Sequence, residues 1–170
     1  MQRTLVLRSE SPYDPGPRMR VLLLAIASVG FVGYIPIASG TFGSLVAIPL
    51  LWVVDPLRQI SAPAYVFGYL LLVVAACWVA GRAEALLQEH DSHKIVIDEV
   101  VGYLGATLFL QPTWRNALLA FLIFRVFDVV KPFPASYVDR RLSGGAGIVL
   151  DDVVAGLYSN LVTRLVLLLL

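Results

Sequence analysis

Charged residues are scarce in this sequence. Asp, Glu, Lys and Arg make up 15% of its 170 residues, whereas about a quarter is usual in soluble domains. Hydrophobic residues make up 58%, and the formal net charge of +1 gives no electrostatic basis for binding nucleic acid. The single cysteine, Cys77, excludes a disulfide within the chain. These shortages favour a protein surrounded by lipid over one surrounded by water.

Common catalytic signatures are missing too. The sequence has no Walker loop for phosphate, no Ser-x-x-Lys or Gly-x-Ser-x-Gly nucleophile, and no Asp-x-Asp start of an aspartyl-phosphate hydrolase. Cys77 lies in an apolar run, and Ala83 stands where a tyrosine-phosphatase-like cysteine requires an arginine. Among enzyme classes, hydrolysis assisted by a metal ion remains open.

The apolar residues that dominate the chain form continuous runs and do not alternate with polar residues. Because a helix satisfies its own backbone groups in hydrocarbon, the pattern predicts an all-α, multihelical polytopic membrane bundle of about four to five membrane helices. Residues 1–20 are expected to form a flexible polar arm, and residues 21–170 a single helical membrane domain.

Turn-forming residues divide this domain into segments. Two helices joined by a loop are expected within 21–54, and residues 21–34 are expected to be re-entrant or interfacial. A polar turn at 55–58 then precedes the clearest transmembrane run, 59–81. The remaining expected helices are a hairpin of 95–110 with 116–130, and a last helix at 152–170.

If the chain starts a membrane crossing at Thr41 and the following helices cross in alternating directions, most of the polar segments lie on one side of the membrane. That side receives the Gly40 loop, residues 82–99, residues 125–141 and the Asp151–Asp152 pair. It also receives most basic loop residues, namely Arg18, Arg20, Arg82, Lys94, Lys131, Arg140 and Arg141. Because cytoplasmic loops are enriched in Lys and Arg, we expect this side to face the cytoplasm.

Five of the 12 acidic residues lie inside or at the ends of apolar segments, where burying a carboxylate is costly. They are Asp98, Glu99, Asp128, Asp151 and Asp152. In both 97–102 and 150–156, an acidic pair near a predicted helix start is followed one turn later by a glycine, which lets another helix approach closely.

Such a set of oxygen ligands, without cysteine or histidine among them, suits Mg²⁺. We therefore predict that Asp98, Glu99, Asp151 and Asp152 hold magnesium. The alternative is that Asp98 or Asp151 caps a helix N-terminus.

Basic residues follow in the segment 124–132. Arg125 and Asp128 are three residues apart on one helix face, so they form a salt bridge, or Arg125 grips phosphate oxygens in its planar fork while Lys131 neutralises charge. The segment Gly40-Thr41-Phe42-Gly43-Ser44 precedes an apolar helix, and the amides and hydroxyls of Gly40, Thr41 and Ser44 suit an anion, although glycine loops between helices are common. His90 and His93 are interpreted as surface residues.

Four segments carry a resemblance to a known family: 36–45, 95–102, 124–134 and 144–156. In this order they resemble the phosphatidylglycerophosphatase A family of bacterial membrane enzymes. The resemblance implies a multihelical fold, a magnesium requirement, and hydrolysis of phosphatidylglycerophosphate to phosphatidylglycerol in the inner membrane. Ser39 is a departure, since the family often has proline there.

Two mechanisms remain open: a metal-activated water attacks phosphorus in line, or Asp128 attacks and forms an aspartyl-phosphate. Two functions of other classes also remain: a small cation or proton transporter, and a non-catalytic module that binds anionic lipid. Beyond the lipid substrate and the bilayer, the sequence predicts no partner and no oligomeric state.

Overall fold

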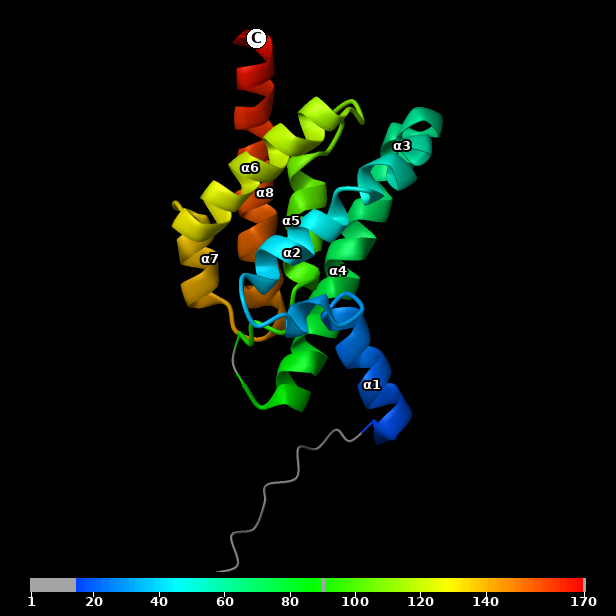
Figure 1. Cartoon of the computed structure of the whole chain (residues 1–170), viewed down its shortest axis with the longest axis vertical. Helices are drawn as coiled ribbons and strands as arrows, with labels where there is room; N and C mark the ends of the chain where they lie inside the picture. Colours follow the sequence, from blue (N-terminus) through cyan, green and yellow to red (C-terminus); the bar gives the residue numbers. More distant parts are fainter. Residues whose placement is uncertain (1–14, 90, 170) are drawn as a thin grey trace, which may run out of the picture.

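The computed structural model describes residues 15–89 and 91–169, and within these ranges the chain is helical and contains no strand (Figure 1). The elements are α1 (Gly16–Ala27), the 3₁₀-helix η1 (Val32–Tyr34), α2 (Ser39–Ala47), α3 (Leu50–Ile60), α4 (Ala62–Leu87), α5 (Ile97–Ala106), α6 (Trp114–Val130), α7 (Ala135–Arg141) and α8 (Gly145–Leu169). The predicted all-α class is therefore confirmed.

The centre of the bundle is the pair α5 and α8, which make the most extensive contact between any two elements. Their backbones touch at two glycines: a Cβ on Gly156 would overlap the carbonyl oxygen of Gly102, and a Cβ on Gly102 would lie 2.8 Å from the carbonyl oxygen of Asp152. The predicted close approach at these glycines is confirmed. It brings the acidic residues that precede them in the two helices to one place.

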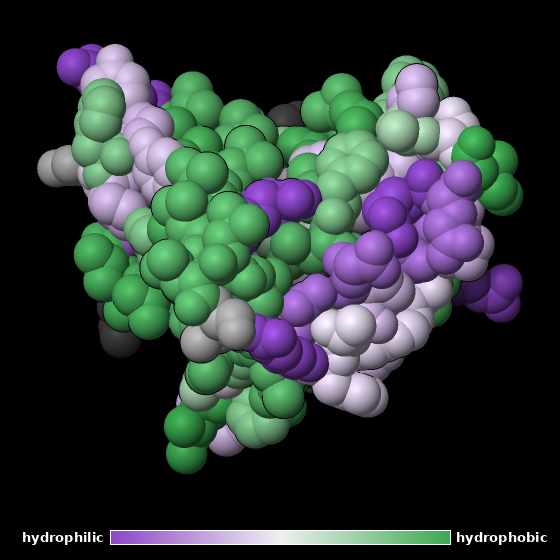
Figure 2. Space-filling model, turned by 90° about the horizontal axis from the view of Figure 1, so that it is seen from above, coloured by the Kyte–Doolittle hydropathy of each residue, from purple (hydrophilic) through white to green (hydrophobic). Residues whose placement is uncertain are grey.

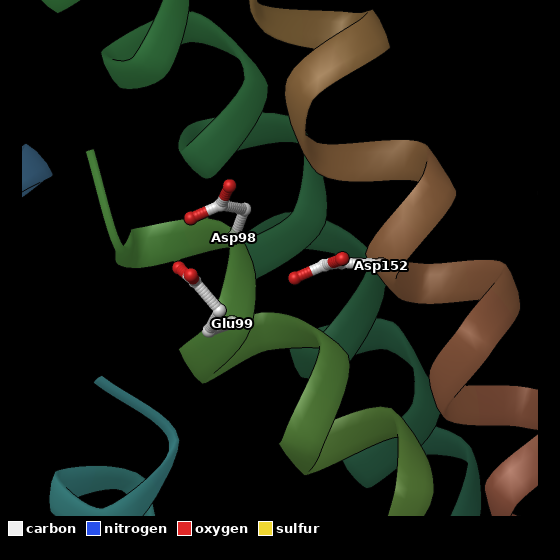
Figure 3. Close-up of side chains that lie close together, drawn as sticks. All are labelled: Asp98, Glu99 and Asp152. Carbon is white, nitrogen blue, oxygen red and sulfur yellow. The ribbon is translucent and has the colours of Figure 1, made fainter. Parts of the chain in front are cut away.

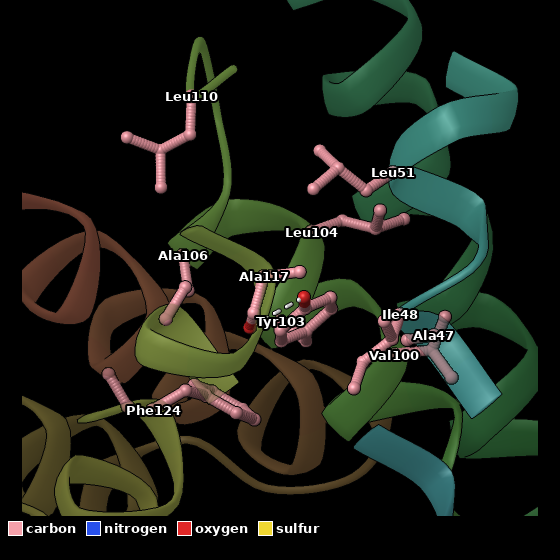
Figure 4. Packing of buried hydrophobic residues seen from close by; sticks show 12 residues of the cluster. Ala47, Ile48, Leu51, Val100, Tyr103, Leu104, Ala106, Leu110, Ala117 and Phe124 are labelled. Carbon is pink, nitrogen blue, oxygen red and sulfur yellow. Dashed lines mark hydrogen bonds between the residues drawn. The ribbon is translucent and has the colours of Figure 1, made fainter. Parts of the chain in front are cut away.

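Residues of α5 are buried almost throughout, and they form the main hydrophobic core with α2, α3 and α6 (Figure 4). Tyr103 is fully buried, its ring packs edge-to-face against Phe124, and its hydroxyl donates to the carbonyl oxygen of Ala117 at 3.1 Å. A buried tyrosine normally needs such a partner. These contacts fix α6, and hence its C-terminal residues, relative to α5.

Within the described part of the chain, two helices are long and apolar enough to cross a membrane, α4 with 26 residues and α8 with 25. The pair α2 and α3, bent by 42°, counts as a third if it forms one broken span. The predicted number of four to five is therefore not confirmed. At 1.5 Å per residue, α5 reaches only about 15 Å and α1 about 18 Å, short of a hydrocarbon core of about 30 Å.

The C-terminal end of the short helix α5 is stabilised by side chains from α8. Asn160 Nδ2 donates to the carbonyl oxygens of Ala106 and Leu108, at 2.9 Å each, and Arg164 donates to the Leu108 oxygen at 2.7 Å. The last carbonyls of a helix have no partner within that helix, so these donors replace water in an apolar setting.

Three predicted boundaries were wrong. The expected turn at 55–58 lies inside α3, where Asp55 accepts from Arg58 and Gln59, and the break falls instead at Ser61, whose hydroxyl caps α4. The last helix starts at Gly145, not Asp152. Residues 16–20 of the expected arm are part of α1, and residues 1–14 lie outside the described residues.

The two ends of the bundle carry different loops. In Figure 1 the loop after α4 lies at the lower end beside α1, α7 and the start of α8 lie between that end and the middle, and the loop between α5 and α6 lies toward the upper end. Seen along the long axis from this second end, polar residues form a band on one side while apolar residues cover much of the rest (Figure 2).

Candidate active site

Three carboxylates meet where α5 begins beside α8. Asp98 and Glu99 lie in the first turn of α5 and Asp152 lies in α8, and one oxygen from each of the three lies within 4.8 Å of the others (Figure 3). This is the predicted convergence of two acidic segments. In Figure 3 the carboxylates of Asp98 and Glu99 lie close to each other at the start of α5, and the Asp152 side chain points from α8 toward them.

Burial makes this acidic cluster costly without a cation. Asp98 is 8% exposed and Asp152 4%, and Oδ1 of Asp98, Oε2 of Glu99 and Oδ2 of Asp152 are buried atoms without a hydrogen-bond partner in the described residues. An unpaired buried polar atom costs about 1–3 kcal/mol, and more for an ionised group. Three carboxylates, each with one oxygen within 4.8 Å of the others, fit a hard divalent cation, since carboxylate oxygens are the ligands that Mg²⁺ accepts.

Helix capping does not explain these acids. The N-cap of α5 is Val96, and no side chain provides a cap there. Asp151 and Asp152 are six and seven residues beyond Gly145, the first residue of α8, so they lie in its second and third turns and not at its start. The capping alternative is therefore wrong for Asp151, whereas Asp98 lies in the first turn of α5 without being its N-cap residue.

The cluster opens into a polar cavity of about 220 Å³. Its lining comes from α2, the loop before α5, α5, the end of α6, and α8; the residues are Ser39, Asp91, Ser92, His93, Ile95, Asp98, Glu99, Asp128, Lys131, Ile148, Asp151 and Asp152. All five carboxylates singled out in the sequence therefore border one space. That space is large enough for a cation together with a phosphate group or several waters.

Two basic residues of the α6 end complete the arrangement. Lys131 Nζ lies 2.5 Å from Oδ2 of Asp151. Arg125 Nη1 lies 2.7 Å from Oδ2 of Asp128 and donates to the hydroxyl of Ser44 at 3.3 Å. Lys131 follows α6 with φ +43°, a left-handed conformation that ends the helix and turns the chain. The predicted salt bridge of Arg125 with Asp128 is confirmed.

The glycine loop packs onto the cluster instead of standing apart from it. A Cβ on Gly40 would overlap Oε1 of Glu99 and lie 3.4 Å from Nη1 of Arg125, so only glycine fits there without a shift. Ser44 is fully buried and donates to the Gly40 carbonyl oxygen at 3.0 Å. Thr41 is half-buried in α2 and is not among the residues that line the cavity.

Sequence reasoning missed the polar rim formed by the loop before α5. Ser39 donates to the His93 carbonyl oxygen at 2.8 Å, and Val96 N–H donates to the Ala27 oxygen at 2.9 Å, which ties the loop to α2 and α1. His93 is exposed, as expected, but it lines the cavity. His90 lies outside the described residues.

A local signal was available for one part of this rim. Glu89 and Ser92 are three residues apart, and the Ser92 hydroxyl donates to the Glu89 carboxylate at 2.6 Å, which lowers the pKa of Glu89. The contacts to α1 and α2 join residues more than fifty positions apart, and no local pattern announces them.

The fold and the cavity define a helical protein with two or three candidate membrane spans and a buried acidic cluster beside basic side chains. Comparison of the sequence gives the particular family. The chain belongs to the phosphatidylglycerophosphatase A family, whose model matches residues 25–167.

Curated relatives agree with this membership. Phosphatidylglycerophosphatase A of Haemophilus influenzae is 36% identical over 139 residues, covering 81% of this chain and 84% of that protein. The Escherichia coli protein of the same name is 36% identical over 137 residues, covering 79% and 77%. A relative from Bacteroides thetaiotaomicron, 34% identical over 75% of this chain and 82% of its own, carries the provisional name of a phosphatidylinositol-3-phosphatase. No solved structure matches the chain.

Proposed function

We propose that this protein is a phosphatase that hydrolyses phosphatidylglycerophosphate to phosphatidylglycerol and phosphate. The observation that carries the proposal is the cluster of Asp98, Glu99 and Asp152, whose buried oxygens face a cavity bordered by Lys131. The names of two relatives, each covering about four fifths of this chain, supply the substrate.

Magnesium is part of the proposal. Asp98, Glu99 and Asp152 would hold the ion, and Asp151, which lines the same cavity, would stand beside it. When bound, Mg²⁺ offsets the carboxylate charge and stabilises the negative charge on the phosphoryl group. The donor set supports magnesium over zinc, because it contains only oxygen ligands.

The basic residues have separate tasks in this proposal. Arg125 would bind two phosphoryl oxygens with its planar guanidinium group, and Lys131 would act as a point charge. Asp151 holds Lys131 at the cavity before substrate binds. Asp128, which also lines the cavity, pairs with Arg125, which is not itself among the lining residues. Such pre-positioning matters, because phosphoryl transfer depends mainly on orientation and on charge stabilisation.

In the reaction itself, the oxygen of a water forms a bond to phosphorus while the bond from phosphorus to the glycerol oxygen breaks. The leaving glycerol oxygen takes a proton, and the water loses one. The products are the diacyl lipid alcohol and inorganic phosphate. An in-line approach requires that the phosphate is held from one side, and Arg125 lies at one side of the carboxylate cluster, next to Gly40 and Glu99.

We further propose that the cavity faces the cytoplasm of a bacterial inner membrane. Arg82 lies in the last turns of α4, Lys94 lies in the loop before α5 that borders the cavity, and α7 ends at Arg141, whereas Arg58 lies in the last turn of α3 and Arg115 in the first turn of α6. The asymmetry of basic residues supports this orientation.

The rival functions fit less well. A transport pathway for cations or protons should distribute its carboxylates through the depth of the membrane, but the five acids border one cavity. A module that only binds lipid needs cations for the phosphate, and it has no use for three buried carboxylates that each leave one oxygen without a hydrogen-bond partner in the described residues.

The test is phosphate release from phosphatidylglycerophosphate in detergent, with and without Mg²⁺, by the wild type and by Asp98→Asn. We expect magnesium-dependent release by the wild type and a loss of at least about 100-fold in the variant, since removing a metal ligand removes transition-state stabilisation. Asp55→Asn, the same change at a buried acid of α3 that does not line the cavity, is the matched control and should retain activity. No release by a folded wild type would overturn the proposal.

A further inference from the structure

An exposed apolar stripe runs along α6 and ends beside the cavity. Leu118, Leu122, Val126 and Val129 are all exposed and recur every three or four residues, so they share one face of the helix. Figure 1 shows α6 on the outside of the bundle, followed by α7. We call these four residues, with Val130 and Phe133 beyond them, the α6 track.

The position of the track relative to the cavity is fixed by the chain. Lys131, which lines the cavity and contacts Asp151, stands between Val130 and Phe133, which are 67% and 76% exposed. The Phe133 carbonyl oxygen accepts from the Tyr158 hydroxyl of α8 at 3.1 Å. Phe133 is therefore held in place at its backbone while its ring projects outward.

The track is long enough to lie along an acyl chain. From Leu118 to Val130 it extends about 18 Å at 1.5 Å per residue. One leaflet contributes about 15 Å of hydrocarbon, half of the core of about 30 Å. A lipid whose headgroup lies at the level of Lys131 would therefore place its acyl chains along the track as far as about Leu122, and Leu118 lies beyond the middle of the membrane.

The headgroup end of the track is basic and aromatic. Phe133 packs against Tyr137 with ring centroids 6.3 Å apart, and the Arg141 guanidinium lies 5.4 Å over the Tyr137 ring. Aromatic rings with a polar tip favour the interface between hydrocarbon and headgroups, and Arg141 adds positive charge beside these rings.

We propose that the α6 track is the binding site for the acyl chains of the lipid phosphomonoester whose phosphate enters the cavity, so that substrate arrives laterally from the membrane past Phe133. This rests on the proposed function and adds residues that bind substrate without touching the phosphate. A water-soluble molecule is disfavoured as the occupant, because the six residues of the α6 track offer it only apolar contacts.

The experiment measures phosphate release from dioleoyl phosphatidylglycerophosphate in mixed micelles, with substrate given as its mole fraction in the micelle. Phe133→Ser is compared with Phe67→Ser, a change at a phenylalanine of α4 that is 63% exposed and lies outside the track. We expect Phe133→Ser to raise KM about tenfold, as the loss of an aromatic contact predicts, with kcat within about twofold. Phe67→Ser should change neither.

A second arm varies the lipid. In Phe133→Ser and in Val129→Ser, the rise in KM should shrink as the acyl chains of the substrate are shortened, because the lost contact is to those chains. A fall in kcat without a change in KM, or equal effects of Phe133→Ser and Phe67→Ser, would overturn the inference. Absence of phosphate release by the wild type would instead overturn the proposed function.

Discussion

Lys131 Nζ lies 2.5 Å from Oδ2 of Asp151, and this ion pair joins the last turn of α6 to α8. The carboxylate of Asp151 is almost fully buried, whereas the lysine is one third exposed. The pair therefore separates Asp151 from the three-carboxylate cluster and holds a cation at the rim of the same cavity. The four acids predicted to bind metal thus occupy two different environments.

Lys131→Met should lower activity strongly and stability as well, because it leaves a buried carboxylate without its cation. Breaking such a pair costs about 3–5 kcal/mol in other proteins. The double variant Lys131→Met with Asp151→Asn should recover most of the stability but not the activity. Thermal unfolding in detergent and phosphate release measure the two effects separately. Recovery of activity in the double variant would show that Lys131 serves only Asp151.

Gly40→Ala should reduce activity with little loss of stability. The added methyl group would overlap Oε1 of Glu99, and that side chain can move only by leaving the cluster or by pressing on Arg125. We expect a loss of about 10–100-fold in kcat, the effect of misplacing a catalytic group by about 1 Å. Gly68→Ala in α4 is the control, since its Cβ would meet only Leu57 at 3.6 Å. Unchanged kinetics in Gly40→Ala would exclude Glu99 from the reaction.

Gly156→Ala should unfold or separate the central helix pair. Its methyl group would overlap the carbonyl oxygen of Gly102, which belongs to the backbone and has no rotamer to escape into. Overpacking of this kind costs about 1–3 kcal/mol or more. Thermal unfolding compared with Gly68→Ala tests the expectation, and equal unfolding temperatures would contradict it.

The central part of the site could be predicted because carboxylates are conspicuous in apolar sequence. Asp98, Glu99 and Asp152 stood out for that reason, and Gly102 and Gly156 indicated which helices meet. The contact of Lys131 with Asp151 could not be predicted, since it depends on how α6 and α8 cross. The start of α8 also depends on packing, because Gly145 fits against the Cys77 carbonyl oxygen of α4. The predicted turn at Asp55 failed because Arg58 and Gln59 satisfy that carboxylate within the helix.

Asn160→Leu tests how α5 can end inside the bundle. The change removes two donors, to the carbonyl oxygens of Ala106 and Leu108, and the aliphatic side chain keeps the volume. Hydrogen bonds between membrane helices average about 0.6 kcal/mol each, so we expect a loss of about 1 kcal/mol in stability. The folded fraction should keep its kcat, because Asn160 lies two turns beyond Asp152 in α8. A loss of kcat at full stability would mean that the end of α5 positions Asp98.

Asp128 is the residue whose role the geometry constrains most directly. Its carboxylate lies 2.7 Å from Nη1 of Arg125, and it borders the cavity. A carboxylate held by a guanidinium group is a weak nucleophile, because its negative charge is already shared. We therefore expect water to attack phosphorus directly and Asp128 to position Arg125.

Asp128→Asn keeps an acceptor for Arg125 and should retain activity within about tenfold, whereas loss of a covalent nucleophile typically lowers activity by about 10⁴-fold or more. Rapid quenching during turnover of ³²P-labelled substrate should leave no label on the protein. A labelled wild type, together with an inactive and unlabelled Asp128→Asn, would instead establish Asp128 as the attacking group.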